Sequence, residues 1–171
     1  MTLKFAPIAL NAAMALALAL SLTGCGLQPM YAGGGSGAVA QGLAAVDVSP
    51  IEGQQGWLMH NALADRLRAG GQANPRYRLD VRLDDKLEGL GLLSDNTVTR
   101  ERRTIRARYQ LVDTASGEIL LDATAGSDAG IDVVSSEYAV IAAEQTALEN
   151  LTREVADQIV SRVAVRLRPA R

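Results

Sequence analysis

An alternation of arginine with apolar side chains in residues 98–112 constrains the fold of this 171-residue chain more than any other feature. Successive side chains of a β-strand point to opposite faces of a sheet, so a period of two separates the two classes. The inward set is Ile105, Ala107, Tyr109 and Leu111, and the outward set is Arg100, Arg102, Arg106 and Arg108. The segment is therefore predicted to be a long strand with one face on a core and one face in solvent.

Three further segments are predicted to be strands of the same sheet. Residues 77–87 alternate in the same way, with Tyr77, Leu79, Val81 and Leu83 on one face and Arg78, Asp80, Arg82 and Asp84 on the other. Residues 43–51 and 118–125 are shorter strands, and Ile119 and Leu121 of the second are expected to point inward. Turns are predicted at 89–96 and 114–117 and a loop at 126–135. Strands joined by short turns must be antiparallel.

Two amphipathic helices complete the predicted fold. Residues 57–69 carry Met59, Leu63 and Leu67 at a spacing of four, and residues 136–167 carry a longer apolar stripe that begins after Ser136, a residue type favoured at the N-cap. The order of the elements predicts an α/β (α+β) domain with the sequence β-α-β-β-β-α. Two helices are expected to pack on one face of a mostly antiparallel four-stranded sheet.

The first 24 residues have the anatomy of a secretory signal. Lys4 precedes a run of Ala, Leu and Met at residues 8–20, which is shorter than the ~20 residues that span a membrane. The following Leu-Thr-Gly-Cys sequence resembles a bacterial lipobox, in which the cysteine is lipidated and becomes the first residue of the mature chain. We therefore expect a signal peptide at 1–24 and a diacylglycerol and N-acyl lipid on Cys25, with no other cofactor.

The remaining composition is that of one nearly neutral domain. Removing 24 residues from 171 leaves 147, and because Lys4 is the only charge removed, 16 basic residues face 19 acidic ones, a net charge of −3. Such a balance argues against nucleic acid as a partner. The Gly-rich residues 25–42 are predicted to be a lipidated N-terminus and flexible tether, followed by a single domain at 43–171.

The residues after Cys25 carry a resemblance to a known family. The sequence Cys-Gly-Leu-Gln-Pro-Met-Tyr at 25–31 is similar to the mature N-terminus of the lipopolysaccharide-assembly lipoproteins of the LptE family, in their alphaproteobacterial branch. Tyr138-Ala139, Ala143-Glu144 and Ala147 resemble the start of that branch's C-terminal helix. The predicted order of elements also fits the LptE layout of two helices on one face of a four-stranded sheet.

The resemblance implies a non-enzymatic role at the outer membrane. LptE proteins plug a large outer-membrane β-barrel, LptD, assist its assembly, and are thought to engage lipopolysaccharide (LPS) on its way to the outer leaflet. The implied partners are therefore an LptD-like barrel, LPS and, through the lipid on Cys25, the periplasmic face of the outer membrane. Gly26 after the cysteine agrees with that location. An auxiliary lipoprotein of a phospholipid or solute ABC transporter is the alternative, and the identity of the partner separates the two.

The residues themselves offer little to an enzyme. His60 is the only histidine, and a lipidated Cys25 is neither a nucleophile nor a zinc ligand. The chain has no nucleophile elbow, phosphate loop or pair of histidines at metal spacing. Asp84-Asp85 and the pair Asp128 and Asp132 lack the dense acidic pattern of a calcium loop. We expect no catalytic residue and no metal site.

The outward arginines are the candidate binding residues. Seven basic side chains at positions 76, 78, 82, 100, 102, 106 and 108 face four acidic ones at 80, 84, 88 and 122, which leaves about three guanidinium groups without partners. Guanidinium groups bind phosphate and carboxylate bidentately, as the headgroup of LPS would require. Cross-strand pairing on an ordinary solvated face explains the same residues, and the two interpretations stay open.

Three leucines lie in the predicted turn at 89–96. Leu90, Leu92 and Leu93 would either contact the barrel wall or acyl chains, or fold back onto the core. The pattern favours neither interpretation.

Overall fold

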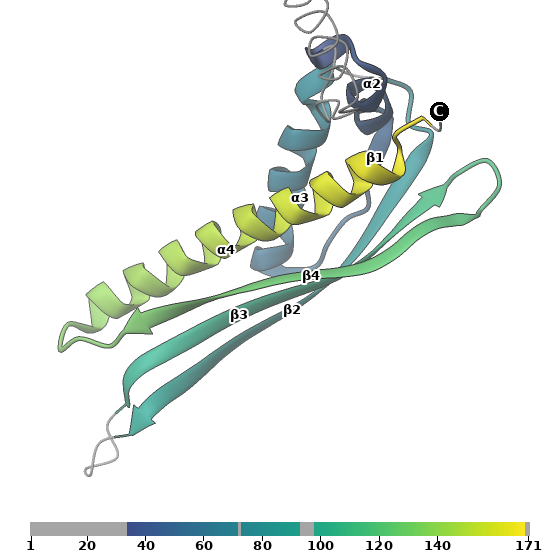
Figure 1. Cartoon of the computed structure of the whole chain (residues 1–171). Helices are drawn as coiled ribbons and strands as arrows, with labels where there is room; N and C mark the ends of the chain where they lie inside the picture. Colours follow the sequence, from purple (N-terminus) through teal and green to yellow (C-terminus); the bar gives the residue numbers. More distant parts are fainter. Residues whose placement is uncertain (1–33, 72, 93–97, 170–171) are drawn as a thin grey trace, which may run out of the picture.

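The computed structural model describes residues 34–71, 73–92 and 98–169. Its elements, in chain order, are η2 (Gly34–Ser36), α2 (Ala38–Ala44), β1 (Val46–Val48), α3 (Gly53–Leu67), η3 (Arg68–Gly70), β2 (Tyr77–Leu92), β3 (Val98–Asp113), β4 (Ile119–Asp132) and α4 (Glu137–Arg166). The two long helices, α3 and α4, lie on the same side of the sheet (Figure 1). Within this part of the chain no helix has the length and hydropathy needed to cross a bilayer.

The sheet has four strands in the order β1-β2-β3-β4, and its pairing confirms the predicted α+β fold. β1 runs parallel to β2, while β2, β3 and β4 form an antiparallel meander. The β2–β3 register runs from Tyr77 opposite Asp113 to Leu92 opposite Val98. This register places the apolar residues of both strands on one face, because side chains directly opposite each other share a face.

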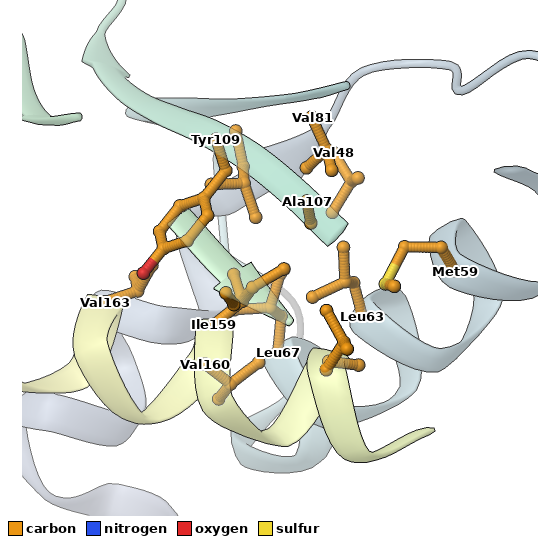
Figure 2. Close-up of a cluster of buried hydrophobic side chains, with 14 of the residues drawn as sticks. Val48, Met59, Leu63, Leu67, Val81, Ala107, Tyr109, Ile159, Val160 and Val163 are labelled. Carbon is orange, nitrogen blue, oxygen red and sulfur yellow. The ribbon is translucent and has the colours of Figure 1, made fainter. Parts of the chain in front are cut away.

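The core lies between that face and the two long helices (Figure 2). Met59, Leu63 and Leu67 of α3 are fully buried, as are the α4 stripe residues Val155, Ile159 and Val163 and, on β3, Ile105, Ala107, Tyr109 and Leu111. These are the residues whose spacing predicted the helices and the strand. A large apolar side chain contributes about 1.5–3 kcal/mol when fully buried, so this cluster dominates the stabilisation.

Part of the predicted tether is folded. Residues 38–42 belong to α2, and Val39, Ala40 and Leu43 of this helix are buried in the core. The expectation of a flexible tether up to residue 42 is wrong for this stretch, because burial of these apolar side chains outweighs the helix-weakening effect of Gly42. Residues 1–33, which include the predicted signal peptide and Cys25, lie outside the described residues.

The fourth strand is longer than predicted. β4 continues to Asp132, so the loop expected at 126–135 is wrong over most of its length. Its Gly, Ser and Asp residues have low strand propensity, but pairing with β3 overrides it. A register shift between Leu111 and Val112 also turns Ile119 outward, where it is 51% exposed, while Leu121 packs against the core as expected.

An ion pair on the inner face joins the sheet to α4. Arg103 donates from Nε and Nη2 to Asp85 at 2.9 and 2.6 Å, and the two side chains are only 15% and 13% exposed. Nη1 of Arg103 also donates to the backbone oxygen of Glu144 at 3.1 Å. Beside them, burial and the negative charge of Glu144 raise the pKa of the Glu101 carboxyl. The position of Arg103, two residues before Ile105, is the signal that it faces inward.

The start of α3 depends on a close approach. A Cβ at Gly56 would lie 2.5 Å from the backbone oxygen of Ile51. We therefore predict that Gly56→Ala lowers the free energy of unfolding by about 1–3 kcal/mol, although alanine is the better helix former. Gly42→Ala is the matched control, since its Cβ would make an ordinary 3.5 Å contact with Leu167. Urea unfolding measures both, and equal stability of the two variants would contradict the prediction.

Removal of Arg103 should leave the carboxylate of Asp85 without its partner in a nearly dry site. We predict that Arg103→Ala lowers the free energy of unfolding by about 2–3 kcal/mol. Arg100→Ala, which removes a mostly exposed ion pair with Asp132, should change it little. The measurement is the urea midpoint of unfolding at constant m-value. A similar midpoint for both variants would show that the buried ion pair stabilises the protein no more than the exposed pair does.

Candidate ligand-binding face

The outer face of the sheet, which lies opposite the helices, carries all six arginines proposed as anion-binding residues. They are exposed, and they come from two neighbouring strands: Arg78 and Arg82 from β2, and Arg100, Arg102, Arg106 and Arg108 from β3. The register places Arg82 directly opposite Arg108 and Asp84 opposite Arg106. The alternation of the sequence therefore predicted the shared face correctly.

Most of these arginines have a carboxylate partner. The N–O distances are 3.0 Å for Arg78–Asp80 and Arg108–Asp122, 3.5 Å for Arg100–Asp132 and 3.8 Å for Arg102–Asp128. The expected surplus of about three guanidinium groups is too high, because the extended β4 brings Asp128 and Asp132 onto this face. Pairing of this kind is what an ordinary solvated face would show at these four positions, and a role in binding stays a prediction.

Two of the pairs are reinforced by neutral donors. Arg108 and Gln110 both donate to Asp122, and they hold the pKa of that carboxyl below its usual value. Arg78, together with the hydroxyl of Ser49, lowers the pKa of Asp80 in the same way. In both pairs the contacts favour the ionised carboxylate, which is the form that pairs with the arginine.

Arg82 and Arg106 differ from the other four. Among the described residues, neither has a carboxylate oxygen within 4.0 Å. Both line a hollow of about 510 Å³ that also includes Arg108 and, from α4, Arg162. Asp84 is the only acidic residue in its lining, which makes the hollow cationic. Like charges directly opposite each other on a sheet repel. A bound anion would therefore reduce the electrostatic repulsion between the guanidinium groups of Arg82 and Arg108.

A glycine keeps this hollow open. A Cβ at Gly126 would lie 3.1 Å from the backbone oxygen of Ile105 and 3.3 Å from Cγ of Arg106. The side chain of Arg106 therefore crosses the space that any larger residue at position 126 would need. The arrangement suits phosphate, because each planar guanidinium can donate two parallel hydrogen bonds to it.

Sequence reasoning missed the contribution of α4. Arg162 donates to the backbone oxygen of Thr124 at 2.8 Å, and the amide of Gln158 bonds both the nitrogen and the oxygen of Gly126 at 3.4 and 3.3 Å. Arg166 donates to the oxygen of Leu120 at 2.7 Å. The sequence does contain a pattern that indicates this contribution: Gln158, Arg162 and Arg166 are four residues apart, and residues at this spacing lie on one side of a helix.

The other predicted site residues are less informative. Leu90 is half-buried on β2, opposite Arg100, and Leu92 ends the strand. The side chain of Leu92, the whole of Leu93 and the lipidation site Cys25 lie outside what is described, so their roles stay predictions. His60 is half-buried on α3. The described residues contain no group of three or more metal-ligating side chains.

Three solved structures share the fold. A lipoprotein from Caulobacter crescentus is 25% identical, with a TM-score of 0.65 over 78% of this chain and 100% of its own. A minor lipoprotein from Acinetobacter baumannii is 12% identical, with a TM-score of 0.58 over 71% of this chain and 92% of its own. The rare lipoprotein B of Shewanella oneidensis is 13% identical, with a TM-score of 0.52 over the same shares, 71% and 92%.

The family follows from the sequence. No curated protein is significantly similar to the chain. The profile of the LptE family, described as lipopolysaccharide-assembly, matches residues 43–163, which is more than half of the chain and covers every element from β1 through most of α4. The chain belongs to the LptE family of lipopolysaccharide-assembly proteins.

Proposed function

We propose that this protein is a non-enzymatic outer-membrane lipoprotein that assembles with the LPS-translocating barrel LptD as its plug. We further propose that the cationic hollow around Arg82 and Arg106 binds phosphate groups of LPS. Membership of the LptE family is the observation that carries the proposal. The hollow supports its second part, because four arginines line it on an exposed face with Asp84 as the acidic residue of the lining, and among the described residues only Arg108 of the four has a carboxylate partner, Asp122.

The apolar surface supports a partner for this domain. Val134, Tyr138 and Ile141, which surround the start of α4, are more than half exposed, and Tyr138 reaches 83%. Large apolar side chains that gather at one end of a domain commonly mark a protein or membrane contact. Leu90, on the outer face of β2, would extend such a contact if the predicted roles of Leu92 and Leu93 hold.

The lipid on Cys25 would set the location. A single acyl chain gives only marginal membrane binding, whereas two or more hold a protein stably at the surface. A lipidated Cys25 would therefore keep the domain at the periplasmic face of the outer membrane. The folded α2, packed in the core, would begin only about a dozen residues after this anchor.

Co-purification tests the partnership. We predict that the affinity-tagged full-length protein, extracted in mild detergent, recovers a large outer-membrane β-barrel in equal amount. Recovery should persist with Cys25→Ala, because the protein contact rather than the lipid holds the pair. Recovery of an inner-membrane ATPase complex would favour the auxiliary role in an ABC transporter, and recovery of the protein alone would argue against both assignments.

Charge reversal tests the hollow. We predict that Arg82→Glu with Arg106→Glu weakens LPS binding by roughly a hundredfold or more, because each of the two charge-assisted contacts contributes about 1.5–3 kcal/mol. The matched control is Arg68→Glu with Arg168→Glu, which changes the net charge equally at exposed positions outside the hollow. Calorimetric titration with purified LPS gives the affinities. Equal weakening by the two double variants would return the outer face to the interpretation of a solvated surface.

A further inference from the structure

The free edge of β4 is divided into two unlike halves. β4 is the last strand of the sheet, so one of its edges pairs with β3 and the other faces no strand. The backbone groups that point away from β3 belong to even-numbered residues, because Gln158 bonds both the nitrogen and the oxygen of Gly126 and Arg162 bonds the oxygen of Thr124. Backbone direction alternates along a strand, so Asp128, Gly130 and Asp132 point the same way.

The first half of this edge is closed and the second half is open. Between Leu120 and Gly126, side chains of α4 bond four of the outward groups: Arg166 the oxygen of Leu120, Arg162 the oxygen of Thr124, and Gln158 both the nitrogen and the oxygen of Gly126. Beyond Gly126, no described residue donates to or accepts from the outward backbone groups of Asp128, Gly130 and Asp132. Exposed strand edges of this kind are templates for pairing with another chain.

A groove runs beside the open half. Its volume is about 530 Å³, and it lies between residues 128–132 of β4 and the first half of α4. Near its start the helix presents the small side chains of Ala142, Ala143, Thr146 and Ala147 to the groove, and toward its middle it presents Asn150, Leu151 and Glu154. The longer Gln158 and Arg162, which bond the other half of the edge, lie beyond the groove. No described side chain of α4 bonds the outward backbone groups of Asp128, Gly130 and Asp132, and the small side chains near the start of the helix leave room beside them for a second backbone.

We propose that this groove binds an extended strand of a partner protein, which adds to the sheet next to β4. The added strand would exchange backbone hydrogen bonds with Asp128, Gly130 and Asp132. The five residues from Asp128 to Asp132 span roughly 13 Å between their first and last Cα atoms, at about 3.3 Å for each of the four steps, which is the length of one short strand. Addition of a strand to an open sheet edge is an established mode of peptide recognition, in which the backbone supplies affinity.

The charges of the groove select the occupant. Its lining includes Asp128, Asp132 and Glu154 and no basic residue. Arg102 and Arg100 approach the two aspartates from the outer face at 3.8 and 3.5 Å, and Glu154 has no basic side chain within 4.0 Å among the described residues, so the groove keeps a negative excess. A second copy of this chain is a poor fit, because two-fold pairing about Gly130 would set Asp128 of each copy opposite Asp132 of the other, and like charges opposite each other destabilise a sheet. The occupant is therefore a strand of a different protein with lysine or arginine at alternate positions. Only the assignment of that strand to the outer-membrane barrel rests on the proposed function.

One pair of variants separates backbone pairing from other effects. Gly130→Pro removes the outward N–H of Gly130 and fills the edge with its ring, and proline is tolerated on edge strands. Gly130→Ala keeps the N–H, and its Cβ meets only the flexible end of Arg100 at 3.3 Å. Ala143→Trp is an independent variant that fills the groove from α4 and leaves the sequence and backbone N–H groups of β4 unchanged. Thermal melts establish that each variant folds.

The first test uses the full-length protein and its co-purified barrel. We expect Gly130→Pro and Ala143→Trp to reduce barrel recovery roughly tenfold, and Gly130→Ala to leave it unchanged. Residue-resolved hydrogen exchange should show that the amides of Asp128, Gly130 and Asp132 become protected in the complex. The amides of Ala129 and Ile131, which face β3, should be protected with or without the barrel. Full recovery with both groove variants, and no new protection at the three edge amides, would overturn the inference while leaving the partnership intact.

A second test decides the case if no barrel co-purifies with the wild-type protein. The probe is a seven-residue peptide of alternating threonine and lysine, with a glutamate counterpart as the charge control. NMR shifts confined to residues 128–132 and 142–150, produced by the lysine peptide and absent with Gly130→Pro, would support a strand site independent of LptD. No shift with either peptide, or equal shifts with both, would refute the proposed occupant.

Discussion

The register between β2 and β3 is the constraint on which the other features of the molecule depend. It sets Leu79 opposite Leu111 and Val81 opposite Tyr109, and so makes one face apolar enough to hold α3 and α4. A shift of β3 by one residue would turn its four outward arginines, Arg100, Arg102, Arg106 and Arg108, toward the core. The ion pair of Arg103 with Asp85 reinforces the same register from the inner face, because the same shift would turn Arg103 outward and leave the carboxylate of Asp85 on the inner face without its partner.

Strong periodicity made the centre of the fold predictable. The buried residues of β3 and the stripes of α3 and α4 could be identified from spacing alone, because each element buries one face against many partners. Weak segments were not predictable in the same way. The helix α2 and the second half of β4 consist of Gly, Ala, Ser and Asp, whose local preferences are small, and their structure comes from contacts with distant residues.

The candidate site shows the same division. Alternation placed six arginines on one face, but the pairing of each depends on which carboxylates the neighbouring strands bring beside it. Because β4 was predicted to end at residue 125, Asp128 and Asp132 were absent from that account. With these two pairs included, the anion-binding hypothesis is limited to the hollow around Arg82 and Arg106 instead of the whole outer face. Arg162 also lines this hollow, but it belongs to α4, and the alternation of side chains along the strands gives no information about a helix residue.

The distribution of burial along α4 has a mechanical consequence. Every buried residue of this helix lies between Ala147 and Ala164, whereas its first ten residues bury none. Local opening costs least where few apolar contacts are lost, so the molecule has a rigid half under α3 and a softer half around the start of α4. In the proposed role as a barrel plug, an end that yields while the rest keeps its shape would let the domain adjust to the barrel wall as the two proteins assemble.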